Sequence, residues 1–188
     1  MKKNMYDQYI NHFEDALDPI FCDQVVDFFN SYLEKKIETN YGTGENTSSK
    51  KILLDSLSES DKGNYHIKDY IYSTIRKFII ESIIPKVYPI VNFDLEPIQI
   101  RKMIGPTLNH SDNVDPINLN NRISYRVITI LANISESSDV LVFPRQNIRI
   151  PLSRKSIIAF PPYWMFEHFS ESTKPGRITI ATWVRESV

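Results

Sequence analysis

Apolar positions in the first half of the chain recur with the 3.6-residue period of amphipathic helices. One helix is predicted to begin after Asp18, a good N-cap residue, with Pro19 at its first position. Its apolar positions are Ile20, Phe21, Val25, Phe28, Phe29, Tyr32 and Leu33. A second helix is predicted over residues 65–84, where Pro85 is expected to stop it.

The stretch 38–63 between these helices is polar and contains Gly and Ser. We expect a long surface loop here, with a short ordered piece around residues 52–54. Such a loop is equally compatible with a lid over a substrate and with an inert surface insertion.

After Pro89 the apolar period changes to two, which is typical of β-strands. Several β-branched or aromatic segments follow, at 98–104, 126–133, 140–143, 148–150, 156–160 and 177–184. Helices followed by strands predict an α+β fold, in which two helices buttress one face of a β-sandwich or jelly roll.

The chain length and composition favour one domain with a sizeable core. The chain has 188 residues, of which 41% are apolar and 24% charged. We expect a single domain over 1–188, with a helical N-terminal part at 1–90 and a strand-rich core at about 95–185.

Charge and cysteine content narrow the class of protein. Lys plus Arg number 22 and Asp plus Glu 23, a net charge of −1, which argues against gripping nucleic acid or anionic membrane through bulk charge. Cys22 is the only cysteine, so an intramolecular disulfide and a Cys-based zinc cluster are excluded, and a reducing compartment is favoured. No signal peptide or membrane-spanning run is visible, so we expect a cytoplasmic protein.

A candidate metal site begins at His110-Ser111-Asp112. In an extended segment residues i and i+2 point to one face, so His110 and Asp112 would offer two adjacent metal ligands. His168 lies 168 − 110 = 58 residues later, beyond four predicted strands, and would complete a two-His, one-carboxylate set. An isolated His-x-Asp also arises by chance, and a histidine after an aromatic run is often simply packed, so a structural role stays open.

A candidate anion site follows at Arg177 and Thr179, which share one face of a predicted strand, with Ile178 and Ile180 on the other. A guanidinium pointing into the sandwich needs an anionic partner, because burying it unpaired is costly. The distal carboxylate of a small dicarboxylate would supply one, together with the Thr179 hydroxyl. The alternative is an ordinary surface arginine at a strand end.

Taken together, His110-x-Asp112, His168 and Arg177 nine residues later (177 − 168 = 9) resemble the iron(II)/2-oxoglutarate-dependent dioxygenases, closest to the prolyl 4-hydroxylase-like subgroup. The resemblance covers about residues 95–185 and includes the segments RVITILAN, VLVFP and SIIAF. It implies a double-stranded β-helix (jelly roll), buttressed on one sheet by the N-terminal helices.

The resemblance also implies cofactors and roles. Fe(II) would be held by His110, Asp112 and His168, while Arg177 and Thr179 would anchor the distal carboxylate of 2-oxoglutarate. O2 would be the oxidant, and ascorbate is a further candidate cofactor.

The chain departs from the family pattern around the cosubstrate. Relatives often carry a tyrosine on the strand after the metal loop, where this chain has Thr129-Ile-Leu. Thr129 and Tyr125 are therefore the candidates for that contact. On the strand before the metal loop, Gln99 or Arg101 would supply polar contacts.

The resemblance implies hydroxylation of an unactivated C–H bond with release of succinate and CO2, and peptidyl proline is the first substrate hypothesis. The alternatives are a nucleobase or small-molecule oxygenase of the same superfamily, a zinc-type hydrolase, and a non-catalytic jelly-roll binding module. Trp183 stands where nucleobase-acting relatives usually have a second arginine. We therefore expect a peptide or small-molecule substrate chosen by loops 38–63 and 113–124, no nucleic-acid or membrane partner, and leave the oligomeric state open.

Overall fold

The computed structural model describes residues 7–32, 37–38, 48–57, 65–87, 90, 92–119, 122–172 and 176–187. The strands within these residues are β1 (Asn11–Phe13), β2 (Ile37–Glu38), β3 (Ser48–Leu53), β4 (Phe93–Leu95), β5 (Gln99–Ile104), β6 (Ile117–Leu119), β7 (Arg122–Asn133), β8 (Val140–Phe143), β9 (Ile148–Pro151), β10 (Ile157–Phe160), β11 (Phe169–Glu171) and β12 (Arg177–Ser187). The helices are η1 (Asp7–Tyr9), α1 (Pro19–Ser31), η3 (Leu54–Ser56), α2 (Tyr65–Phe78), the π-helical turn η4 (Ile79–Ile83), α3 (Ile84–Val87) and η5 (Trp164–Phe166).

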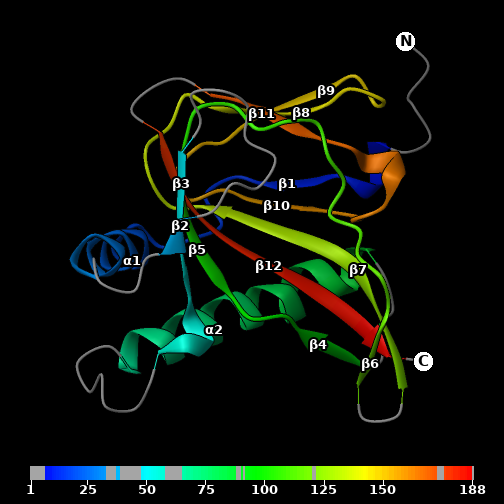
Figure 1. Cartoon of the computed structure of the whole chain (residues 1–188), viewed down its shortest axis with the longest axis horizontal. Coiled ribbons are helices and arrows are strands. Elements are labelled where there is room, and N and C mark those ends of the chain that lie inside the picture. Colours follow the sequence, from blue (N-terminus) through cyan, green and yellow to red (C-terminus); the bar gives the residue numbers. More distant parts are fainter. Residues whose placement is uncertain are drawn as a thin grey trace.

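The strands form two antiparallel sheets. The larger has the order β1-β10-β7-β12-β5-β3-β2, with β4 also pairing with β12 and β6 with β7, and the smaller has the order β11-β8-β9. The smaller sheet lies on one side of the molecule and α1 and α2 on the other, with the long strands β7 and β12 between them (Figure 1). This is the jelly roll with buttressing helices that the sequence predicts.

Alternation along the central strands separates two apolar clusters. On β10, Ile157 and Ala159 pack with the helices, whereas Ile158 and Phe160 pack with the smaller sheet. On β12, Ile178 and Ile180 face the helices. The predicted division of this strand into an apolar face and a face carrying Arg177 and Thr179 is therefore present.

Helix α1 begins where the sequence predicts. The Asp18 carboxylate accepts hydrogen bonds from the N–H groups of Ile20 (2.7 Å) and Phe21 (3.4 Å), which satisfies two of the free donors of the first turn. Cys22 is buried on the inner face, and burial raises the pKa of its thiol to about 11, which leaves it protonated and unreactive at neutral pH.

The second helix continues past Pro85, contrary to the prediction that this residue stops it. Proline lacks an N–H and its ring crowds the carbonyl four residues back, here that of Glu81. The π-helical turn η4 precedes the proline, and within it the Ile84 N–H donates to the carbonyl of Ile79, five residues back. This wider turn accommodates the proline ring, and the helix ends at Val87 as α3.

The stretch predicted as a long loop contains strands instead. β3 pairs with β5 over six residue pairs, from Ser48 opposite Ile104 to Leu53 opposite Gln99, and Ile52 is fully buried. β1, β2 and β3 all belong to the larger sheet. The N-terminal half of the chain therefore contributes strands as well as the two helices. Residues 39–47 and 58–64 lie outside the described part of the chain, so a lid formed by 38–63 stays a prediction.

The second predicted loop, 113–124, is likewise partly a strand. β6 pairs with the start of β7, where Ile117 lies opposite Ser124, while residues 120–121 lie outside the described part. Among the described helices, none is long and apolar enough to cross a membrane.

We expect Asp18→Ala to lower the free energy of unfolding by about 1 kcal/mol, because two N–H groups of α1 lose their acceptor. For a domain of this size that corresponds to a fall in Tm of about 2–4 °C. Urea denaturation followed by circular dichroism measures the change. Asp18→Asn is the matched control, because asparagine caps equally well; equal loss in both variants would contradict the capping role.

Candidate metal centre

A backbone bridge joins two histidines that are far apart in sequence. The N–H of His110 donates to the carbonyl of His168 (3.0 Å), and the N–H of His168 donates to the carbonyl of His110 (2.8 Å). His110 follows β5 and His168 directly precedes β11, so this pair connects the two sheets. The bridge holds the imidazole rings with their centroids 4.5 Å apart.

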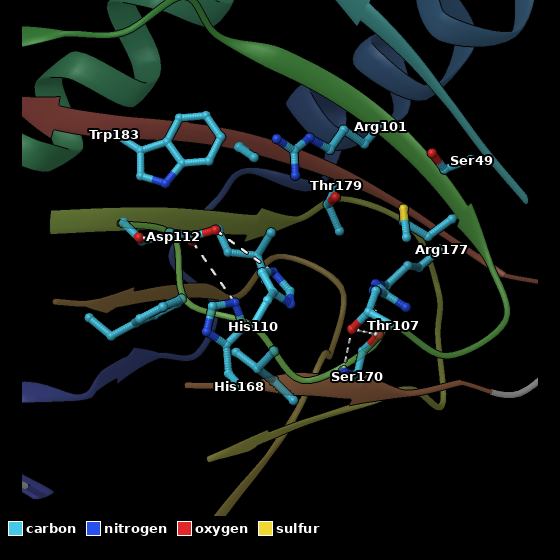
Figure 2. Close-up of a pocket in the computed structure, with 16 residues that line it drawn as sticks. Ser49, Arg101, Thr107, His110, Asp112, His168, Ser170, Arg177, Thr179 and Trp183 are labelled. Atoms are coloured by element: carbon cyan, nitrogen blue, oxygen red, sulfur yellow. Dashed lines mark hydrogen bonds and ion pairs between the residues drawn. The ribbon is translucent and has the colours of Figure 1, made fainter. Parts of the chain in front are cut away.

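The Asp112 carboxylate completes a cluster with these rings. Its Oδ1 lies 3.8 Å from Nε2 of His110, and its Oδ2 lies 3.9 Å from Nε2 of His168. One ligand atom from each of the three residues lies within 4.8 Å of the others. Figure 2 shows the three side chains converging at one side of the cavity. The donor set of two imidazoles and one carboxylate on one face suits a divalent transition metal such as iron(II).

Hydrogen bonds to the backbone set the tautomers of both histidines. Nδ1 of His110 lies 2.8 Å from the carbonyl oxygen of Leu108, and Nδ1 of His168 lies 3.1 Å from that of Phe166. A carbonyl oxygen only accepts, so Nδ1 carries the proton in each ring. The Nε2 lone pairs are then free to bind a metal, as in most histidine metal sites.

Asp112 is held from two sides. The Thr129 hydroxyl donates to its Oδ2 (2.9 Å), and Arg126 Nη1 donates to its carbonyl oxygen (2.8 Å). Burial alone would raise the pKa of the Asp112 carboxyl, but His168, His110 and the Thr129 hydrogen bond together lower it. Burial lowers the pKa of His168. Near neutral pH the cluster therefore has the ionised carboxylate and neutral imidazole that metal binding requires.

Ion pairs of Glu96 with Arg126 and Arg185 support the loop that carries Asp112. Arg126 donates through Nε and Nη2 to the Glu96 carboxylate at 2.6 and 2.5 Å, and Arg185 Nε donates to the same carboxylate at 2.6 Å. The Arg126 guanidinium also lies 4.0 Å from the centre of the Trp183 ring. These ion pairs were not predicted from the sequence, because nothing in the spacing of these residues indicates that they meet.

The cluster forms one end of a cavity of about 80 Å³ between the sheets. Leu131, Leu141 and Phe160 contribute apolar walls, whereas the other end carries Thr107, Ser170, Arg177 and Thr179. In Figure 2, Arg177, Thr107 and Ser170 lie together on the side away from Asp112. The cavity therefore has a metal-binding end and a cationic, hydroxyl-rich end.

Arg177 is only 5% exposed, which excludes the alternative of a surface arginine. The structure also corrects our expectation that its anionic partner must be a ligand. Arg177 Nη1 donates to Oδ2 of Asp139 (2.5 Å) and Nη2 to the Ser170 hydroxyl (2.8 Å). Its Nε is buried without a hydrogen-bond partner among the described residues, so this N–H remains available to a bound molecule.

The structure distinguishes between Thr129 and Tyr125, the two weaker candidates for a cosubstrate contact. Thr129 lines the cavity, but its hydroxyl donates to Asp112, so it positions the Asp112 carboxylate. Tyr125 is 41% exposed and is not among the described residues that line this cavity. The structure therefore does not support a cosubstrate contact for it.

Of the other two candidates, Arg101 lines this cavity, and both Gln99 and Arg101 border a second, adjoining cavity of about 350 Å³. Arg101 donates through Nε and Nη2 to Oε1 of Gln99 at 2.9 and 2.7 Å, and its guanidinium lies 5.3 Å from the centre of the Trp183 ring. His110 and Asp112 line both cavities, so the second one opens directly onto the metal end of the first.

Comparison with solved structures identifies proteins of the same fold. A viral collagen prolyl hydroxylase from Paramecium bursaria Chlorella virus 1, solved as a 2-oxoglutarate complex, aligns with a TM-score of 0.66 at 17% identity, covering 96% of this chain and 97% of that one. A prolyl hydroxylase from Trichoplax adhaerens, in complex with a hypoxia-inducible-factor peptide fragment, aligns with a TM-score of 0.66 at 14% identity, covering 96% and 84%. A non-heme α-ketoglutarate-dependent epimerase from nogalamycin biosynthesis aligns with a TM-score of 0.63 at 10% identity, covering 95% and 78%.

No protein-family model and no curated protein sequence matches the chain. The structural likeness confirms the predicted double-stranded β-helix. It confirms the resemblance to the prolyl 4-hydroxylase-like dioxygenases at the level of the fold.

We expect Thr129→Val to weaken binding of a divalent metal such as Co(II) by about tenfold, because the Asp112 carboxylate loses a hydrogen bond that orients it and lowers its pKa. Titration calorimetry at pH 7 measures the affinity. Thr74→Val, on helix α2, is the control because this helix contributes no residue to the cavity. Unchanged affinity in Thr129→Val would contradict the positioning role.

Proposed function

We propose that this protein is an Fe(II)- and 2-oxoglutarate-dependent dioxygenase that hydroxylates an unactivated C–H bond. The observation that carries the proposal is the presence, in one cavity, of a two-His, one-carboxylate cluster and a buried arginine with a free Nε–H. A zinc hydrolase would use the cluster but would not require the unpaired Nε–H of Arg177 in the same cavity.

His110, Asp112 and His168 would hold the iron through two Nε2 atoms and one carboxylate oxygen. This ligand set occupies one face of an octahedron and leaves the other positions for cosubstrate and oxidant. The chemistry that the bound iron supplies is O2 activation coupled to oxidative decarboxylation, in which R–H, O2 and 2-oxoglutarate give R–OH, succinate and CO2.

The rest of the cavity orients the cosubstrate and keeps water away. The Arg177 Nε–H and the Thr179 hydroxyl would bind the distal carboxylate, which leaves the 2-oxo acid end toward the cluster. Leu131, Leu141 and Phe160 exclude water along the length of the cavity, which strengthens every polar contact inside it. Fixing the orientation of the reactants in this way accounts for much of the rate enhancement in such sites.

The substrate would approach through the adjoining cavity, which borders His110 and Asp112. Asn113 and Val114 on its rim are exposed, as is Leu108 nearby. Peptidyl proline is the substrate that we propose to test first, since two of the similar structures are prolyl hydroxylases and one of these holds a peptide. We propose the cytoplasm as its location, since a single unpaired cysteine and a supply of Fe(II) both suit a reducing compartment.

We expect purified protein supplied with Fe(II), ascorbate and 2-oxoglutarate to form succinate in an O2-dependent manner. Asp112→Ala should abolish succinate formation, because the cluster loses its carboxylate. Asp115→Ala removes an exposed carboxylate from the same loop and should retain activity. Absence of succinate from folded, iron-loaded protein under all substrates, or equal activity in both variants, would contradict the proposal.

We expect proline-containing peptides to raise the rate of succinate formation above the rate without substrate, with an increase of 16 mass units in the peptide. Free amino acids and single-stranded oligonucleotides serve as comparison substrates in the same assay. Stimulation by one of these in place of the peptides would leave the dioxygenase assignment intact and overturn the choice of substrate.

A further inference from the structure

Asp139 places a fixed negative charge beside the arginine at the far end of the cavity. Its side chain is 1% exposed, and Oδ2 accepts hydrogen bonds from Arg177 Nη1 (2.5 Å) and from the Ser172 hydroxyl (2.9 Å). Its backbone is held as well, because its N–H donates to the Ser137 hydroxyl (3.0 Å) and its carbonyl accepts from the Leu152 N–H (2.9 Å). The Asp139 carboxylate is therefore held in a fixed position beside Arg177.

The Asp139 carboxylate reduces the net positive charge at this end of the cavity. Arg177 contributes one positive charge, and Asp139, which lies behind it and does not line the cavity, one negative charge, while Thr107, Ser170 and Thr179 beside them are uncharged. The other cation of the described lining, Arg101, donates to Gln99 and acts on Asp112 at the metal end, where it helps lower the pKa of that carboxyl. A ligand carboxylate attracted to the guanidinium is at the same time repelled by the Asp139 carboxylate. The Nε–H still provides a directed hydrogen bond, since it is buried without a partner among the described residues.

We propose that Asp139 sets the cosubstrate preference, so that this cavity recognises the distal end of a 2-oxo acid mainly as a hydrogen-bond acceptor and only weakly as an anion. The inference rests on the proposed function and concerns the same cavity. It implies that a 2-oxo acid with an uncharged acceptor at its distal end competes with 2-oxoglutarate for this protein. Specificity is then relaxed by a repulsive element within the site.

Two roles for Asp139 give opposite results. If it only holds Arg177 in place, then Asp139→Asn weakens 2-oxoglutarate binding, because the guanidinium loses its orientation. If it neutralises Arg177, then Asp139→Asn strengthens binding of the dicarboxylate, because the repulsion is removed while the shape of the side chain is kept. An uncharged analogue gains nothing from this change.

The experiment measures the Kd of 2-oxoglutarate and of its 5-methyl ester by anaerobic titration calorimetry on Fe(II)-loaded protein. The ester keeps the acceptor carbonyl and lacks the charge. We expect wild-type protein to prefer 2-oxoglutarate by about tenfold or less, and Asp139→Asn to prefer it by about a hundredfold, through tighter binding of 2-oxoglutarate alone. Glu171→Gln, which removes an exposed carboxylate paired with Arg149, is the matched control and should behave as wild type.

A preference of a hundredfold or more in wild-type protein would overturn the inference, as would weaker 2-oxoglutarate binding in folded Asp139→Asn. If that variant does not fold, because Arg177 loses its buried partner, the wild-type ratio decides alone. Failure of both compounds to bind iron-loaded wild-type protein would overturn the proposed function itself. Binding of both with the wrong ratio would overturn only the role of Asp139.

Discussion

The central strands β10 and β12 are buried on both faces along most of their length, and this constraint determines where the polar side chains of the cavity lie. Alternation puts every second side chain against the helices, where the side chains of β12 are apolar except for Thr182, whose hydroxyl donates to the Glu96 carbonyl. The remaining side chains face the space between the sheets. A shift of one residue in the register of β12 would exchange Ile178 and Ile180 with Arg177 and Thr179, and would bury a guanidinium against the helical layer. The apolar core therefore also specifies the site.

Several buried or half-buried charged groups at and near the cavity form ion pairs. Glu96 receives both Arg126 and Arg185, and Asp139 receives Arg177. Such pairs contribute little net stability, because desolvation offsets much of their attraction, but losing one partner is strongly destabilising. Their effect here is positional. Arg126 fixes the backbone of the metal loop at Asp112, and Asp139 fixes the guanidinium at the opposite end of the cavity.

The two ends of the cavity are assembled by different means. At the metal end, a backbone bridge sets the distance between His110 and His168, and backbone carbonyls orient their rings. At the other end, side chains from separate strands meet through a buried ion pair and hydroxyl groups. The first arrangement depends on main-chain geometry that many sequences can form, whereas the second depends on side-chain identity. Differences in ligand preference within this fold are therefore expected at the arginine end.

Local sequence determined the features that depend on neighbours in the chain. The N-cap at Asp18, the switch from helical to strand periodicity and the shared face of Arg177 and Thr179 all follow from spacing over a few residues. The proximity of His110 and Asp112 follows from the two-residue period of an extended segment, although they lie in a loop that pairs with the facing segment at Thr107 and His110. His168 could be proposed as a third member only from the expected sandwich topology and the family motif, because 58 residues separate it from His110 (168 − 110 = 58).

Tertiary structure alone decided the contacts that join distant segments. Local polarity predicted a loop over 38–63 with an ordered piece only around 52–54, but β3 spans 48–53 because it pairs with β5 on one side and with β2 on the other, while Ile52 is buried. Pro85 continues a helix because a π-helical turn precedes it, which composition does not reveal. The sequence indicated that Arg177 needs an anion but not that Asp139 supplies it, since 177 − 139 = 38 residues separate the two. Spacing shows which face a side chain occupies, whereas the register of distant strands decides which side chains it meets there.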